Sequence, residues 1–83
     1  MPSLLKEWRR TRRESGYWQK ARERSEVLRE PEIVNEIELA VMLMGQHLSM
    51  YRRGGDRERQ LDQLREVRLG LEACLGMLEN ILP

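Results

Sequence analysis

The sequence has no phenylalanine, one cysteine, one histidine and no apolar run of about 18 residues or more. Because Cys74 has no second cysteine to pair with, the disulfide framework of small secreted domains is excluded. The lack of a long apolar run argues against a membrane-spanning helix, and Lys6 and Arg9 stand where a signal peptide would be apolar. These absences predict a cytoplasmic protein with no membrane insertion.

Length and charge limit the architecture further. The 83 residues make one domain at most, and a domain of this size cannot bury a large core. Charged residues make up 35% of the chain and hydrophobic residues 40%, a balance typical of long helices with one apolar stripe. Residues 1–30 carry nine basic and five acidic side chains (net +4), whereas residues 31–83 carry six and nine (net −3). We expect a basic N-terminal helical extension over 1–30, a hairpin over 31–83, and a protein partner.

The clearest periodicity lies between Pro31 and Tyr51, where apolar residues recur in alternating steps of three and four. This first heptad stripe consists of Val34, Ile37, Val41, Met44, Leu48 and Tyr51. Proline suits the first turn of a helix, and Gly54 can adopt the left-handed conformation that ends one. The pattern predicts a helix over residues 31–53.

A second helix is predicted over residues 56–82, directly after a short connection. Its heptad stripe consists of Leu64, Val67, Leu71, Leu75, Leu78 and Leu82, and Leu61 precedes them. Asp56 stands where an N-cap carboxylate accepts hydrogen bonds from the first free N–H groups of a helix. A short connection makes consecutive helices antiparallel neighbours. The predicted turn consists of Arg53, Gly54, Gly55 and Asp56. The predicted fold class is therefore all-α, an antiparallel helix hairpin held together by its two heptad stripes.

The N-terminal residues have a weaker pattern. Their apolar residues Leu4, Leu5, Trp8, Trp18, Ala21 and Leu28 are compatible with one or two helical segments. Ser15 and Gly16 interrupt this pattern, and Glu30, which precedes a proline, is biased away from the α region. We expect one or two helical segments and a break before the hairpin.

Both hairpin helices carry further apolar or small residues away from the heptad stripes. They are Leu39, Met42, Leu43 and Met50 in the first helix and Leu69, Ala73 and Met77, beside Gly70 and Gly76, in the second. One hypothesis is a partner-binding face, because methionines adapt to irregular partners and exposed apolar patches mark contact surfaces. The other is that residues 1–30 of the same chain pack on them. The sequence leaves both open.

The sequence shows no set of polar residues spaced so that they would converge in an active site. His47 has no second histidine or cysteine at ligand spacing, so no metal site is predicted. Cys74 lies on the apolar side of its helix, where a free cysteine behaves mostly as a small hydrophobe. The two glycines of the turn lack the lysine and the longer glycine pattern of a phosphate loop. We expect no enzyme activity and no cofactor.

A basic stretch with interleaved aromatic residues precedes the hairpin. Its candidate contacts to phosphates and bases are Arg9, Arg10, Arg12, Arg13 and Trp18. Interspersed glutamates dilute this charge, and a mixed-charge helix anchored by its aromatic residues has the same pattern. Nucleic-acid binding is therefore the weaker interpretation.

Three features occur together between Tyr51 and Leu82, in YRRGGDRERQLDQLREVRLGLEACLGMLENIL. An arginine and two glycines precede an aspartate, a first helical turn rich in glutamine and arginine follows, and the helix closes on a leucine pattern. These closing residues are the leucines Leu71, Leu75 and Leu78, together with Glu72. With these features the chain resembles the small co-chaperones of type III secretion needle subunits, the YscE-like family. The resemblance extends from about Ile33 onward, and residues 1–30 have no counterpart in it.

The resemblance implies a function as well as a hairpin fold. Such a hairpin pairs with a tetratricopeptide-like chaperone subunit, and the pair keeps the needle-forming subunit soluble and unpolymerised in the cytoplasm. On this hypothesis the residues away from the heptad stripes contact the larger chaperone, and the isolated chain can also form a homodimer. The alternative is a homodimeric four-helix bundle whose basic N-terminal arm binds nucleic acid.

Overall fold

The computed structural model describes residues 16–83. It contains a helical segment over residues 16–25, helix α2 (Glu30–Arg52) and helix α3 (Arg57–Glu79). No strand occurs among residues 16–83, so the prediction of an all-α fold is confirmed. Gly16, the first described residue, is helical, although the sequence indicated an interruption at Ser15 and Gly16; Ser15 lies outside the described residues.

Helix α2 begins one residue earlier than predicted. Its N-cap residue, Arg29, is extended (φ −79°, ψ 161°), and Pro31 follows in the first turn together with Glu30 and Glu32. Carboxylates are favourable at this end because the helix dipole is positive there. The expected break before the hairpin is present at residues 26–29, but Glu30 is the first helical residue and is not part of the break.

The turn between the helices follows the predicted chemistry. Gly54 (φ 90°) and Gly55 (φ 108°) adopt left-handed conformations, which a residue with a Cβ adopts only with strain. Asp56 caps α3, because its Oδ1 accepts a hydrogen bond of 2.8 Å from the backbone N–H of Arg59. The predicted hairpin turn is confirmed, whereas α3 ends at Glu79, earlier than the predicted residue 82.

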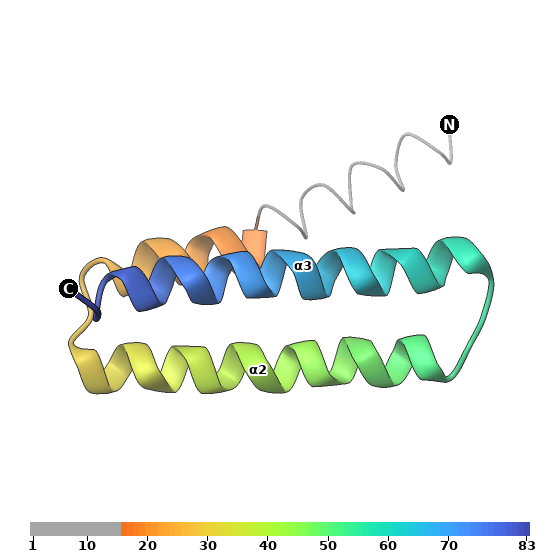
Figure 1. The fold of residues 1–83 in the computed structure, drawn as a ribbon, viewed down its shortest axis with the longest axis horizontal. Coiled ribbons are helices and arrows are strands. Elements are labelled where there is room, and N and C mark those ends of the chain that lie inside the picture. The colour runs from red at the N-terminus through yellow and green to blue at the C-terminus, as the bar shows by residue number, and fades with distance from the viewer. Residues whose placement is uncertain (1–15) are drawn as a thin grey trace.

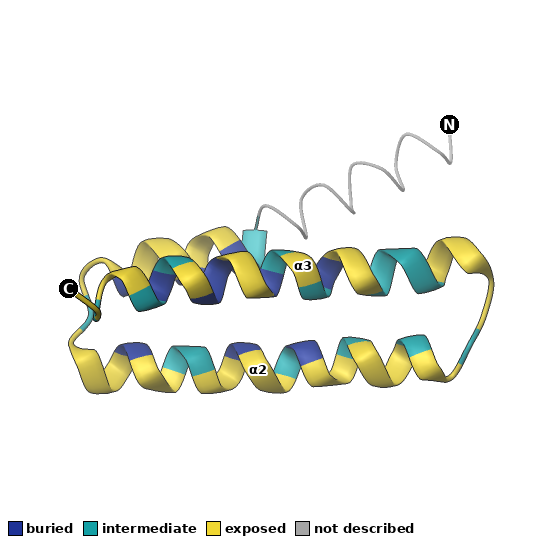
Figure 2. Ribbon diagram, viewed as in Figure 1, coloured by how far each residue is buried: buried dark blue, intermediate teal, exposed yellow. Residues whose placement is uncertain are grey.

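Helices α2 and α3 run antiparallel and side by side over their full length (Figure 1). Each turns a strip of buried residues toward the other (Figure 2). The buried apolar core consists of Trp18, Ile33, Ala40, Met44, Ala73, Cys74 and Met77. Gly70 lies among them, with Met44 directly against its Cα. The hairpin interface is therefore built largely from small residues and methionines.

The helical segment of residues 16–25 supplies the third layer. It runs beside α3 in the same direction (Figure 1), and Trp18, Ala21 and Ser25 are buried against the hairpin. Of the two hypotheses for the small residues of α3, packing by the N-terminal part of the same chain is the one observed at Gly70 and Gly76. One face of the hairpin is thus covered within the chain.

The two heptad stripes point inward only in part. Ile37, Met44 and Val67 belong to the core or pack against it. Seven other stripe residues are exposed, namely Val34, Val41, Leu48, Leu64, Leu71, Leu75 and Leu82. The reason is that α3 turns its small residues Gly70, Ala73 and Cys74 inward, and α2 packs on them with Ile33, Ala40 and Met44. The prediction that the heptad stripes as a whole hold the hairpin together was wrong.

A substitution at Gly70 tests how closely Met44 and Trp18 pack against α3. A Cβ at Gly70 would lie 2.7 Å from Met44 Cγ and 3.0 Å from the Trp18 ring, whereas a Cβ at Gly45 has nothing within 4 Å. We expect Gly70→Val to lower the free energy of unfolding by about 1 to 3 kcal/mol through overpacking. The matched variant Gly45→Val should be near neutral, because valine is a slightly better helix former than glycine. Urea unfolding measures both, and equal effects would contradict the close approach.

Candidate interaction surface

Trp18 fixes the helical segment to the hairpin. Its ring lies against Gly70, and its indole Nε1–H donates a hydrogen bond of 2.8 Å to Oε2 of Glu66. Both side chains are buried. Tyr17 packs edge-on against the indole, with the ring centroids 5.0 Å apart. A buried carboxyl group is costly without a donor, so this hydrogen bond specifies one position for the indole.

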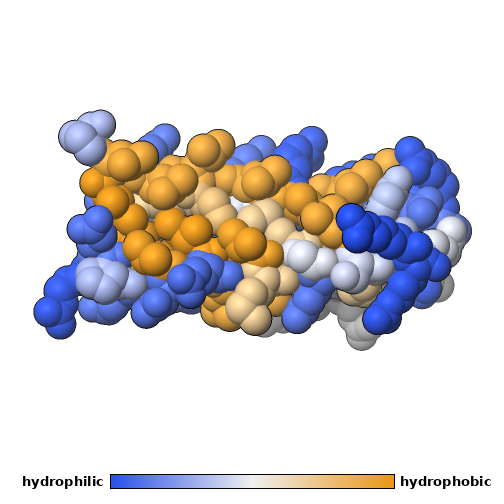
Figure 3. Space-filling model, turned by 60° about the horizontal axis from the view of Figure 1, so that its bottom comes forward, coloured by the Kyte–Doolittle hydropathy of each residue, from blue (hydrophilic) through white to orange (hydrophobic). Residues whose placement is uncertain are grey.

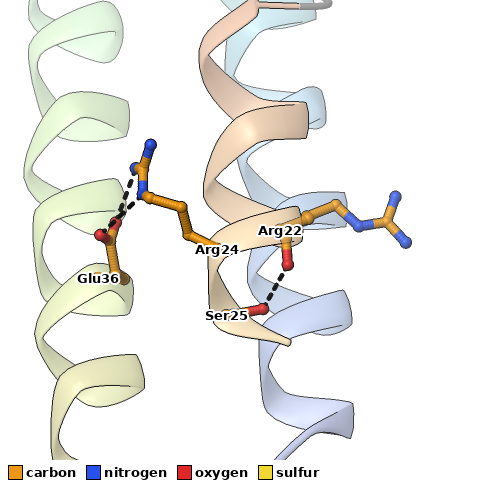
Figure 4. A network of polar contacts seen from close by, with 4 residues as sticks. All are labelled: Arg22, Arg24, Ser25 and Glu36. Carbon is orange, nitrogen blue, oxygen red and sulfur yellow. Dashed lines mark hydrogen bonds and ion pairs between the residues drawn. The ribbon is translucent and has the colours of Figure 1, made fainter. Parts of the chain in front are cut away.

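A second set of contacts fixes the far end of the segment. The Asn80 side chain donates a hydrogen bond of 2.9 Å to the Ser25 hydroxyl, which itself donates to the backbone carbonyl of Arg22 at 2.6 Å. Arg24 points to the opposite side and pairs with Glu36 of α2 at 3.2 Å (Figure 4). The segment is thereby attached to both helices of the hairpin.

The structure places three of the predicted partner-binding residues on the covered side of α3. Ala73 (1% exposed) and Met77 (0%) are buried, and Leu69 is half-buried against the core. These side chains contact their own chain in this structure, so a partner could reach them only after the segment had moved away. The buried Glu66 belongs to the same side, and the sequence interpretation missed it. The signal was its spacing of four and seven residues from Gly70 and Ala73, which put a carboxyl group on a small-residue face.

The predicted partner-binding residues of α2 are mostly accessible. Leu39, Met42 and Met50 are exposed, and Leu43 is half-buried against the core. Leu39 also borders a surface hollow of about 250 Å³, whose other lining residues are Leu28, Glu32, Asn35 and Glu36. That volume lies below the range of about 300 to 1,000 Å³ that is usual for small-molecule sites.

A larger apolar surface lies on the other side of the hairpin. We call it the open face, and it consists of the seven exposed stripe residues Val34, Val41, Leu48, Leu64, Leu71, Leu75 and Leu82. Leu75 is 63% exposed and Leu82 62%. Large apolar side chains that gather in this way on a protein surface mark contact sites for other molecules.

The open face lies opposite the segment 16–25 on both helices. Leu71 and Leu75 stand two residues on either side of the buried Ala73, which places them about half a turn away around α3. Val34 is likewise two residues from Glu36, which pairs with Arg24 of the segment. Figure 3 shows a broad hydrophobic area that runs along the molecule, with hydrophilic residues at both ends.

The remaining candidate residues have structural roles. His47 Nδ1 lies 2.6 Å from Gln63 Oε1, a contact that joins α2 to α3. Cys74 is buried, and desolvation raises the pKa of its thiol from the ordinary value of 9.0, so the reactive thiolate is scarce at neutral pH. Within residues 16–83, no group of three His, Cys, Asp or Glu side chains is arranged to hold a metal ion.

The basic stretch falls largely outside the described residues. Arg9, Arg10, Arg12 and Arg13, together with Leu4, Leu5 and Trp8, lie in residues 1–15. Trp18 is described, and its burial against Gly70 leaves no ring face for a nucleic-acid base.

Comparisons with protein-family models, with curated proteins and with solved structures gave no match to this chain. Among residues 16–83, neither α2 nor α3 is apolar enough to cross a membrane. The candidate site therefore depends on geometry, and the open face is the set of exposed apolar residues on which it is built.

The Trp18–Glu66 hydrogen bond provides a direct test of how the segment is held. We expect Trp18→Phe to lower the free energy of unfolding by about 1 to 3 kcal/mol, because it keeps an aromatic ring but removes the donor to a buried carboxyl group. Adding Glu66→Leu should recover part of that loss, because it removes the unsatisfied group. Gln19→Ala, which removes the exposed Gln19–Glu23 hydrogen bond, is the control and should change stability by less than about 0.5 kcal/mol. A double variant whose loss equals the sum of the single losses would refute the coupling.

Proposed function

We propose that this protein is a non-catalytic, helix-binding interaction module, and that its specific role is that of a cytoplasmic co-chaperone for a type III secretion needle subunit. In this role the open face binds a tetratricopeptide-like chaperone subunit. The pair keeps the needle-forming subunit soluble and unpolymerised. The observation that carries the proposal is the open face itself, an apolar surface on a helix hairpin whose other side is already covered.

The spacing of the open face favours a helical partner. Val34, Val41 and Leu48 recur every seven residues along α2, and Leu64 and Leu71 have the same separation on α3. Such spacing forms ridges that interdigitate with the side chains of another helix. Tetratricopeptide-like proteins consist of helix pairs, so they offer surfaces of this kind. The resemblance of the segment from Tyr51 to Leu82 to the YscE-like co-chaperones supports the same class of partner.

The energetics require most of the open face in such a complex. The side chains are already partly buried, so covering each one contributes on the order of 1 kcal/mol. Association itself costs an estimated 4 kcal/mol or more in lost freedom of motion. A partner that touched two or three of these residues would not bind stably, whereas one that covered both helices would.

The proposal moves the contact surface from the one that the sequence indicated. Ala73 and Met77 are buried in the chain, and Leu71 and Leu75 take their place on the side of α3 that faces solvent. The exposed residues of α2 away from the open face, such as Met50, provide a comparison surface within the same molecule.

Co-expression tests the proposal. The chain is expressed with a tetratricopeptide-like type III chaperone and its needle subunit from the same genome, and the soluble complex is quantified. We expect Leu71→Glu with Leu75→Glu to weaken co-purification by on the order of 100-fold, because two charges would be buried in an apolar contact. Met50→Glu, on the far side of α2 and 48% exposed in the free chain, should leave co-purification unchanged.

Circular dichroism of each variant checks that the helices are intact. A helical Leu71→Glu, Leu75→Glu chain that still co-purified like the unmodified protein would refute the open face as the binding site. Failure of the unmodified chain to form any complex with these two proteins would refute the co-chaperone role.

A further inference from the structure

The register of the hairpin brings apolar residues of α2 level with apolar residues of α3. His47 lies beside Gln63, and Gln60 donates to the carbonyl of Tyr51 at 3.2 Å. This register places apolar residues at three levels along the hairpin. Val41 lies level with Leu71 and Leu48 with Leu64, and Val34 lies level with Leu78, a half-buried residue outside the open face. Leu75 lies between two of these levels, and Leu82 lies beyond the level of Val34.

The three levels are evenly spaced, seven residues or about 10.5 Å apart. A half-turn about an axis through the middle level, perpendicular to the helices, exchanges the two outer levels. Apolar levels of one copy then meet apolar levels of a second copy. The three levels can therefore pack on those of a second copy about this axis, as an isologous interface requires.

The charges that border the open face differ on the two sides of the middle level. On the side toward the start of α2 and the end of α3 they are acidic: Glu30, Glu38, Glu72 and Glu79. On the side toward the hairpin turn they are basic: Arg52, Arg57, Arg65 and Arg68. Each lies one, three, four or seven residues from an apolar residue of the open face, which places it beside that face. Arg65 also pairs with Asp62 at 2.7 Å, so Arg68 is the simpler cation for a test.

These charges select one orientation of two faces. When two copies are related by the half-turn described above, the acidic end of each meets the basic end of the other. The other two-fold arrangement, with its axis along the helices, brings acid against acid and base against base. Complementary charges of this kind suppress the wrong alignment.

We propose that the open face binds a second copy of this chain, with α2 packed antiparallel on α2 and α3 antiparallel on α3. The inference rests on the helix-docking face of the proposed function but not on the identity of the larger partner. A dimer of this kind covers the same leucines and valines that the chaperone would contact, so the two complexes exclude each other. In the dimer, Glu72 of one copy lies within about one helical turn of Arg68 of the other.

Charge reversal tests the inference in the full-length chain. Sedimentation equilibrium measures the dimer dissociation constant of the unmodified protein, of Glu72→Arg and of Arg68→Glu at low salt. Each single variant brings like charges together twice across the interface, and we expect its dimer to be on the order of tenfold weaker. An equimolar mixture of the two variants should restore the dissociation constant, because every cross-interface pair then joins opposite charges.

The mixture also controls for effects within the helix. Arg68 and Glu72 are four residues apart, so each variant has a like-charged pair inside its own α3. That pair persists in the mixture, and restored affinity can come only from contacts between chains. Met50→Glu should leave the dimer intact, because Met50 lies two residues from Leu48 and therefore about half a turn away from the open face.

A chain that stays monomeric at millimolar concentration would overturn the inference, as would single variants that dimerise normally or a mixture that stays weak. If the monomeric chain still co-purified with the chaperone through Leu71 and Leu75, the second-copy inference would fail and the proposed function would stand. If the chain formed a dimer with the expected charge dependence but no complex with the chaperone, the second-copy inference would stand and the proposed function would fail.

Discussion

The packing of Trp18 against α3 is the contact on which the rest of the structure depends. The indole ring needs a flat, deep site, which Gly70 provides because it has no side chain, and the indole N–H needs an acceptor, which Glu66 provides at 2.8 Å. Within residues 16–83, no buried side-chain nitrogen or oxygen lacks a hydrogen-bond partner. A polar contact that is satisfied in this way fixes one arrangement more sharply than apolar packing alone.

The orientation of α3 about its own axis follows from this contact with Trp18. For Trp18 to reach Gly70, α3 must turn Gly70, Ala73 and Met77 inward, and Leu71 and Leu75 then necessarily point outward. Within residues 16–83, one short segment is present to cover two apolar faces. The covered face provides most of the core, and the open face remains as the surface available to a partner or to a second copy.

Local chemistry made part of this structure predictable. The glycine turn and the Asp56 cap depend on neighbouring residues, and both were predicted correctly from the sequence, as were two antiparallel helices from their heptad spacing. The face that each helix turns inward could not be predicted in the same way. A heptad stripe and a small-residue stripe are both plausible interiors, and the choice between them depends on a contact between Trp18 and Glu66, 48 positions apart. The same error affected the predicted partner-binding residues of α3, because Ala73 and Met77 were predicted to lie on the outer surface of the hairpin.

Methionine oxidation tests this account most directly, because the two helices carry two exposed and two buried methionines. Met42 and Met50 are exposed on α2, whereas Met44 (7% exposed) and Met77 (0%) are buried. In the folded protein under dilute hydrogen peroxide, mass spectrometry of peptides should find Met42 and Met50 oxidised quickly, and Met44 and Met77 protected until the chain is unfolded. Oxidation of Met77 as fast as that of Met42 would contradict the account, because α3 would then turn toward solvent the face that Trp18 covers.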